Sequence, residues 1–263
     1  MNLQLKGKSV IVTAASKGLG KAIAEEFANE GASVLISSRD EKALKQTAEE
    51  IKDKTKNEHV SYVECDMKDK HDITYLIKTA VKRNGTIHGL VNNAGGPPAG
   101  SFMQMSDDDW YHAFELNLLS YVRTIREAVP FMQKQKFGRI VNIASSSVKE
   151  RIDNLVLSNS IRPGIVGLAK TLSQELGEDN ILINTVGPGT IQTDRIDQLN
   201  QVQAEKQNRT MEQIREKGEA VIPMKRYGQP SEFAKPVVFL GSGANTYVTG
   251  QTMIVDGGSV KAL

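Results

Sequence analysis

Short apolar runs alternate along the chain with segments in which apolar residues recur at helical spacing. The first run, residues 9–14, reads SVIVTA and is rich in β-branched residues, which favour strands. It is followed by residues 18–29, where Leu19, Ile23 and Phe27 are spaced to lie on one face of a helix. The chain therefore opens with a predicted strand and a predicted helix.

The same alternation continues toward the C-terminus and predicts an α/β fold. Further strands are predicted at residues 33–37, 60–64, 89–92, 139–144, 181–186 and 252–255. Further helices are predicted at residues 41–54, 72–83, 107–135, 159–176 and 230–240. Near-continuous apolar runs of this kind suit parallel strands that are covered by helices on both faces. The pattern predicts one doubly wound parallel sheet in a single domain, residues 1–263.

Residues 194–221 break this alternation. The segment is charged and rich in Gln and Glu, yet apolar residues such as Ile196, Leu199, Met211 and Ile214 recur within it. That mixture indicates amphipathic helices, and connections of this length in compact domains are usually functional or mobile. We expect a flap beside a substrate site, with a simple solvated excursion as the alternative.

Composition excludes several classes of protein. The 33 Lys and Arg against 31 Asp and Glu leave a formal charge of +2, too little for a nucleic-acid-binding surface without clustering. No apolar run is long enough to span a membrane. His59, His71, His88 and His112 show no metal-binding spacing with one another or with Cys65, so we predict no metal site.

Cys65 is the only cysteine of the sequence and cannot form a disulfide within the chain. No apolar segment typical of a signal peptide follows the N-terminus. Both features are typical of a protein of the reducing cytoplasm, and we expect a cytoplasmic location.

A glycine-containing turn follows the first predicted strand. It reads TAASKGLG over residues 13–20 and leads directly into a helix. Gly18 and Gly20 allow the backbone to approach a pyrophosphate, which the free amides and positive dipole of a helix N-terminus attract. A glycine pair alone would also fit a plain strand-to-helix turn. Its position between a first strand and a helix is the one that dinucleotide binding requires, so we predict a dinucleotide site.

The end of the second predicted strand distinguishes the two nicotinamide dinucleotides. NAD-binding folds place an acidic residue there for the ribose hydroxyls, whereas an arginine accommodates the 2′-phosphate of NADP. Ser38 stands where the carboxylate would be, and Arg39 follows with a planar, permanently charged group suited to phosphate. Lys17, within the glycine turn, adds a second cation. The two could be ordinary surface charges, but their joint placement predicts NADP(H).

Several motifs resemble those of the short-chain dehydrogenase/reductase family in order and spacing. They are the TAASKGLG turn at 13–20, Asp66 after the third predicted strand, NNAG at 92–95, GPG at 187–189 with Thr193, and VDGG at 255–258. The resemblance covers nearly the whole chain. It implies a Rossmann-type sheet of seven parallel strands in the order 3-2-1-4-5-6-7, and assembly into a homotetramer.

Ala14 replaces the first glycine of the family's TGxxxGxG turn. Alanine fits many turn conformations that do not need a positive φ, so we expect the turn to keep its form.

The resemblance also implies which residues contact the coenzyme. They comprise the glycine turn, the end of the second strand, the residues after the third and fourth strands, one basic residue near the active site and the segment after the sixth strand. In this sequence they are Thr13, Ser16, Lys17, Gly18, Leu19, Gly20, Ser38, Arg39, Asp66, Met67, Asn93, Ala94, Gly95, Arg162, Pro188, Gly189 and Thr193.

Catalysis in this family uses an Asn, a Ser, a Tyr and a Lys, of which the tyrosine exchanges a proton with the substrate oxygen. By resemblance, Asn117 and Ser145 correspond to the asparagine and the serine. The tyrosine often lies thirteen residues beyond that serine and the lysine four further on, and these positions hold Ser158 and Arg162. The segment PGIVGLAK at 163–170, which resembles the continuation of that helix, fixes the alignment.

These replacements change what the site can do. A tyrosine of pKa near 10 can be shifted toward neutrality by an ammonium group, but a serine hydroxyl is far less acidic. Arg162 can bind the nicotinamide ribose, yet it cannot release a proton because the pKa of arginine exceeds about 12. Loss of general acid catalysis removes roughly 10² to 10⁴ in rate, while positioning of the reactants remains. A relay from Ser158 through water, or entry of Lys206 or Lys217 from the flap, would supply the proton.

The sequence leaves two functions open. The first is an NADP(H)-dependent oxidoreductase that acts on a carbonyl or alcohol group of a small-molecule substrate through an atypical catalytic site. The alternative is a catalytically impaired NADP(H)-binding sensor or interaction protein, in which Ser158 is only a small polar residue, because a fold does not fix a function. Lyase or isomerase chemistry has no positive support, and no pattern names the substrate.

Overall fold

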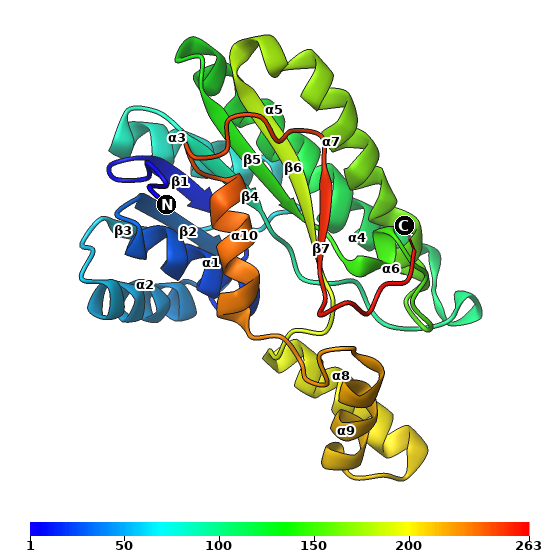
Figure 1. Ribbon diagram of the computed structural model, residues 1–263. Helices are drawn as coiled ribbons and strands as arrows, with labels where there is room; N and C mark the ends of the chain where they lie inside the picture. Colours follow the sequence, from blue (N-terminus) through cyan, green and yellow to red (C-terminus); the bar gives the residue numbers. More distant parts are fainter. Residues whose placement is uncertain (263) are drawn as a thin grey trace.

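The computed structural model, which describes residues 1–262, contains a central parallel sheet with helices on both faces (Figure 1). The strand order is β3-β2-β1-β4-β5-β6-β7, and every neighbouring pair is parallel. The strands are β1 Ser9–Val12, β2 Ser33–Ser38, β3 Val60–Glu64, β4 Gly89–Asn92, β5 Gly138–Ile143, β6 Ile181–Pro188 and β7 Thr252–Val255. The predicted fold class and strand order are confirmed.

Alternate residues of each strand enter two separate hydrophobic layers. Val10 and Val12 of β1 pack in one layer with apolar side chains of helices α1, α2 and α10. Ile11, between them, packs in the other layer with side chains of α3, α5 and α7. Burial on both faces explains why the strands read as continuous apolar runs. The helix bounds are α1 Gly18–Asn29, α2 Glu41–Thr55, α3 Lys70–Asn84, α5 Ser120–Lys134, α7 Pro163–Glu175 and α10 Pro230–Leu240.

Two predicted helices are interrupted. The helix predicted at 107–135 consists of α4 Asp107–Phe114, a π-helical segment Glu115–Leu119, and α5. The helix predicted at 159–176 begins earlier, as α6 Val156–Ile161, and is separated from α7 at Pro163, which has no amide hydrogen to continue the ladder. π-Helical segments occur frequently at functional sites. Both interruptions lie beside residues that the sequence analysis assigned to the catalytic set.

Residues 194–221 form α8 Asp194–Gln207 and α9 Met211–Val221. The two helices lie against each other and project from the body of the molecule beyond the end of β6 (Figure 1). Ala204 and Ile214 are the buried apolar residues of this pair. Among residues 1–262, no helix combines the length and the apolar character needed to cross a membrane.

Candidate active site

The glycine turn between β1 and α1 is closely packed. Gly18 has φ of +58°, in the left-handed region that favours glycine. A Cβ on Gly20 would lie 2.4 Å from the Ala14 carbonyl oxygen and 2.8 Å from Asn93 Nδ2. No side chain fits in that space. The turn therefore requires glycine at position 20 for close approach and favours it at position 18 for conformation.

Ala14 also adopts a left-handed conformation, with φ of +47°. The expectation that the turn needs no positive φ at this residue is wrong. The reason is tertiary, because Asn93 Nδ2 donates hydrogen bonds to the carbonyls of Thr13 (3.2 Å) and Ala14 (3.1 Å) and so holds the backbone there. The turn keeps its form at the cost of conformational strain in an alanine.

Replacing Ala14 with glycine is expected to stabilise the fold by about 0.5–1 kcal/mol. Relief of the left-handed strain of alanine outweighs the extra backbone entropy that glycine gives the unfolded chain. Urea unfolding of the purified variant measures the change in free energy of unfolding. Ala15→Gly is the matched control, because Ala15 is fully buried and has no positive φ, and it should destabilise. Equal destabilisation by both substitutions would contradict this account.

The turn is joined to the NNAG segment after β4. The Thr13 Oγ1 hydroxyl donates to the Asn93 carbonyl at 2.7 Å, and the Asn93 amide donates back to Thr13 Oγ1 at 2.8 Å. These residues follow neighbouring strands, β1 and β4, at the point where the strand order reverses. Open α/β sheets bind their ligands in the crevice at that point. A Cβ on Gly95 or Gly96 would meet no atom within 4 Å, so the NNAG segment borders open space.

The two predicted phosphate-binding cations are both accessible. Arg39 is exposed directly after β2, whose end is tied to the turn by the bond from the Ala15 amide to the Ser37 carbonyl (2.9 Å). The nearest carboxylate in sequence, Asp40, caps α2 by accepting the Ala43 amide. Lys17 Nζ lies 3.7 Å from Asp194, but about 70% of each side chain is exposed, so the pair contributes little.

The other predicted coenzyme contacts lie at strand ends on the same edge of the sheet. Asp66 follows β3, and its Oδ1 accepts the Lys68 amide at 2.9 Å, while Met67 is buried. Gly189, after β6, packs so closely under Asp256 that a Cβ would lie 2.5 Å from the Asp256 Cβ. Thr193 lies beside Gly18, because a Cβ added to Gly18 would lie 3.7 Å from the Thr193 Cγ2.

Asn117 occupies the π-helical segment and is almost completely buried. Its Nδ2 donates to the Gly95 carbonyl at 2.8 Å, which ties the helix to the NNAG segment. Its Oδ1 is buried without a hydrogen-bond partner among the described residues. A buried, unpaired acceptor is costly, and a donor from water or a ligand would satisfy it.

The serines of the predicted catalytic set form one hydrogen-bonded group. Ser145 Oγ accepts the Ser147 amide at 3.1 Å, within a short 3₁₀ turn after β5. The Ser147 and Ser158 hydroxyl oxygens are 2.9 Å apart, and both residues are buried. Ser145 and Ser158 are therefore brought together through Ser147. Ser147 was not among the predicted site residues, although it belongs to a visible run of three serines at 145–147.

Arg162 is a buried cation, with 5% of its surface exposed. Its Nη1 donates to the carbonyls of Ile143, at 3.2 Å, and Ala144. No ion pair of the described residues includes it. Burial lowers the pKa of the guanidinium, because the charged form loses its hydration. Arginine offers five N–H donors in a fixed fork, so the group can serve further acceptors such as ribose hydroxyls.

The base of the flap touches both sides of the predicted cleft. Arg195 Nη2 donates to the Pro97 carbonyl at 3.1 Å, and the neighbouring Asp194 faces Lys17 of the glycine turn. Lys206 and Lys217, which could have supplied a proton, are exposed on α8 and α9. The structure therefore places the start of α8, rather than either lysine, beside the turn.

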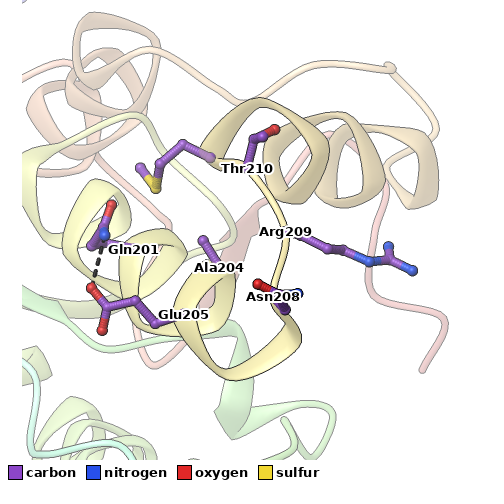
Figure 2. A pocket seen from close by; sticks show the side chains of 7 residues that line it. Gln201, Ala204, Glu205, Asn208, Arg209 and Thr210 are labelled. Carbon is purple, nitrogen blue, oxygen red and sulfur yellow. Dashed lines mark hydrogen bonds between the residues drawn. The ribbon is translucent and has the colours of Figure 1, made fainter.

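A hollow of about 320 Å³ lies between α8 and α9, and Figure 2 shows its lining side chains. They include Gln201 and Glu205, which are hydrogen-bonded to each other at 2.8 Å, and Arg209. The hollow is built by the flap alone and contains none of the residues at the strand ends. We therefore locate the candidate active site at the β1–β4 crevice and not in this hollow.

Comparison with known proteins identifies the family. A family model described as Enoyl-(Acyl carrier protein) reductase matches residues 13–260. The 3-oxoacyl-[acyl-carrier-protein] reductase FabG of Thermotoga maritima is 34% identical over 263 residues, covering 98% of this chain and 100% of the relative. The NADPH-dependent reductase BacG of Bacillus subtilis is 30% identical, covering 97% and 99%.

A solved structure shows the same arrangement over the full length. The L-sorbose reductase of Gluconobacter frateurii, complexed with NADPH and L-sorbose, superposes with a TM-score of 0.95 at 30% identity and covers 100% of both chains. The chain belongs to the short-chain dehydrogenase/reductase family, in the group that the Enoyl-(Acyl carrier protein) reductase model describes. The chain is thus a member of a family of oxidoreductases.

Proposed function

We propose that the protein is an NADPH-dependent reductase of a small carbonyl compound. The main support is the geometry at the point where the strand order reverses. There the glycine turn, which has no room for a side chain at position 20, is hydrogen-bonded to the NNAG segment. Arg39 follows the neighbouring strand β2. A coenzyme fits these residues, since Gly95 and Gly96 border open space, Asn117 Oδ1 is buried without a partner, and the hydrogen bonds of the Arg162 guanidinium all leave from Nη1.

In this proposal each part of the site has one task. The turn at 13–20 holds the pyrophosphate, and Arg39 with Lys17 holds the 2′-phosphate. Asp66 and Met67 contact the adenine, and the NNAG segment, Pro188, Gly189 and Thr193 hold the nicotinamide half. Arg162 donates to the nicotinamide ribose. The FabG, BacG and sorbose reductase relatives, whose names or titles state reduction, support the direction of the reaction.

The bound coenzyme supplies a hydride to the carbonyl carbon, while the carbonyl oxygen must gain a proton. Ser145 donates a hydrogen bond that polarises the carbonyl. The hydroxyl pair of Ser147 and Ser158 passes a proton from water to the oxygen, so one hydride and one proton convert C=O to CH–OH. Because a serine hydroxyl is a poor acid, we expect a turnover number below that of tyrosine-containing relatives by roughly 10² or more.

Turnover tests this reaction directly. Oxidation of NADPH is followed against a panel of aldehydes and ketones, including short 3-oxoacyl thioesters and keto sugars. We expect at least one substrate to be reduced above the enzyme-free rate, and Ser158→Ala and Ser147→Ala each to slow it by about 10-fold, less than the roughly 10² lost with an efficient general acid, because a serine hydroxyl is a poor acid. Background rates throughout, together with rescue by Ser158→Tyr with Arg162→Lys, would refute native reductase activity.

That second outcome would favour the alternative, an NADP(H)-binding sensor or interaction protein. This alternative is supported by the burial of Ser158, of which 4% is exposed. Its hydroxyl forms a hydrogen bond with Ser147. In such a protein the coenzyme would order the flap through the contacts of Lys17 and Arg195 at its base.

We further propose that the protein is a cytoplasmic homotetramer. β7 is an edge strand of the sheet, and Met253 on it is 39% exposed, as expected of a surface that another copy covers. Cys65 is a buried free cysteine, and burial raises the pKa of its thiol to about 12, as for a structural cysteine that forms no disulfide.

A further inference from the structure

Tyr121 is a fully buried tyrosine at the centre of the candidate site. It lies in the first turn of α5, one helical turn after Asn117, and none of its surface is exposed. Its ring packs against Ala144 and Ile165, with Ala94 and Leu118 beside them. The ring thus fills the space between the ends of β4 and β5 and the start of α7.

The phenol of Tyr121 shares a backbone acceptor with Arg162. Its hydroxyl donates to the Ile143 carbonyl at 2.9 Å. Arg162 lies close enough for its charge to act on the phenol, and its Nη1 donates to the same Ile143 carbonyl. One carbonyl therefore receives both the tyrosine and the arginine, and so couples their positions.

Tyr121 does not replace the tyrosine that is absent at position 158. Burial raises the pKa of Tyr121 to about 12, and the opposing effects of Arg162 and the Ala94 amide do not overcome it. The phenol therefore stays protonated at physiological pH, and its hydrogen is committed to Ile143. A general acid needs a pKa near the working pH and access to the substrate, and Tyr121 has neither.

Arg162, in contrast, needs support. Its guanidinium is held at Nη1 alone, by the carbonyls of Ile143 and Ala144 where β5 ends. Tyr121 donates to the same Ile143 carbonyl, and Ala94 of the NNAG segment packs against the cluster that the tyrosine ring forms with Ala144 and Ile165. Groups that orient a binding side chain in this way raise its effectiveness, because less entropy is lost when the ligand binds.

We propose that Tyr121 is a positioning residue for the coenzyme: its phenol orients the Ile143 carbonyl, and through it Arg162, while its ring packs with Ala94, in the arrangement that receives the nicotinamide ribose. The proposal rests on the coenzyme-binding role given above to Arg162. It assigns to Tyr121 an effect on the nicotinamide half of the coenzyme and none on the adenosine half.

Tyr121→Phe removes one oxygen and keeps the packed ring. Binding of two probes is measured by titration calorimetry: NADPH, and adenosine 2′,5′-bisphosphate, which contains the adenosine half alone. We expect NADPH to bind about 5- to 10-fold more weakly to the variant, as for loss of one neutral hydrogen bond, and the bisphosphate to bind within about 2-fold of wild type. Tyr62→Phe, at a half-buried tyrosine of β3, is the matched control and should change neither.

A double-mutant cycle shows whether Tyr121 acts through Arg162. In an Arg162→Lys background, Tyr121→Phe should weaken NADPH binding by less than about 2-fold, because lysine lacks the fork that the Ile143 carbonyl orients. Unchanged NADPH binding in Tyr121→Phe, an equal loss for both probes, or full additivity with Arg162→Lys would each overturn the proposal. Failure of wild-type protein to bind either probe would instead refute the proposed function itself.

Discussion

Replacing Gly20 with alanine is expected to weaken NADPH binding by about 10- to 100-fold and to lower the melting temperature. The added Cβ would lie 2.4 Å from the Ala14 carbonyl oxygen and 2.8 Å from both Ala15 Cα and Asn93 Nδ2. The first two are backbone atoms, and Asn93 Nδ2 is held in place by its hydrogen bonds to the carbonyls of Thr13 and Ala14. Overpacking of this kind costs about 1–3 kcal/mol, and each 1.4 kcal/mol corresponds to about 10-fold in affinity.

We expect this overpacking to weaken coenzyme binding, because the atoms that must move to make room for the Cβ are those that form the turn. Asn93 would lose its bonds to Thr13 and Ala14, and the free amides of α1 would turn away from the pyrophosphate. Gly177→Ala is the matched control, since a Cβ there would meet nothing within 4 Å. Calorimetric titration and thermal melting of both variants measure the effects. Wild-type affinity in Gly20→Ala would show that the coenzyme does not lie on this turn.

Replacing Arg39 with alanine is expected to weaken NADPH binding by at least about 10-fold and to change NADH binding by less than about 2-fold. Arg39 is exposed after β2, and the neighbouring Asp40 is engaged in capping α2. A hydrogen bond between a guanidinium and a phosphate contributes about 1.5–3 kcal/mol, and only NADPH carries the 2′-phosphate.

Salt gives a second test of the same contact. Because Arg39 is accessible, the difference between wild type and Arg39→Ala should shrink as ionic strength rises. Arg83→Ala, at an exposed arginine near the end of α3, is the control and should leave both affinities unchanged. If Arg39→Ala weakens NADPH and NADH equally, the arginine does not recognise the 2′-phosphate.

The sheet and its two layers of helices could be predicted because local pattern and tertiary burial agree. Strands such as β1 and β5 are apolar at successive positions, and both of their faces are covered in the structure. The glycine turn could also be predicted from local sequence, because its glycines directly follow the apolar run of β1 and precede a helix. The sequence also located the break in pattern where α8 and α9 form.

Features that depend on contacts between distant segments could not be predicted. The left-handed conformation of Ala14 is imposed by Asn93, 79 residues away. The π-helical segment at Glu115–Leu119 has no signal in the apolar spacing, which continues through it as in an ordinary helix. Ser147 meets Ser158 only because the turn after β5 folds back over α6.

The contacts of Tyr121 in the candidate site also could not be predicted from the sequence. It follows Asn117 by four residues, so helical spacing predicts that the two share a face. Its contact with the Ile143 carbonyl, and its nearness to Arg162, depend on how α5, β5 and α7 pack. The sequence therefore gives the position of such a residue on its helix, while its role depends on the assembled fold.

Titration calorimetry of the wild-type protein with NADPH and with NADH, at one ionic strength, shows whether the β1–β4 crevice binds a 2′-phosphorylated dinucleotide. We expect one NADPH per chain, bound at least about 10-fold more tightly than NADH, because β2 ends in Ser38 rather than in a carboxylate and is followed by Arg39. No heat with NADPH, or tighter binding of NADH, would contradict the assignment of this crevice to a 2′-phosphorylated dinucleotide.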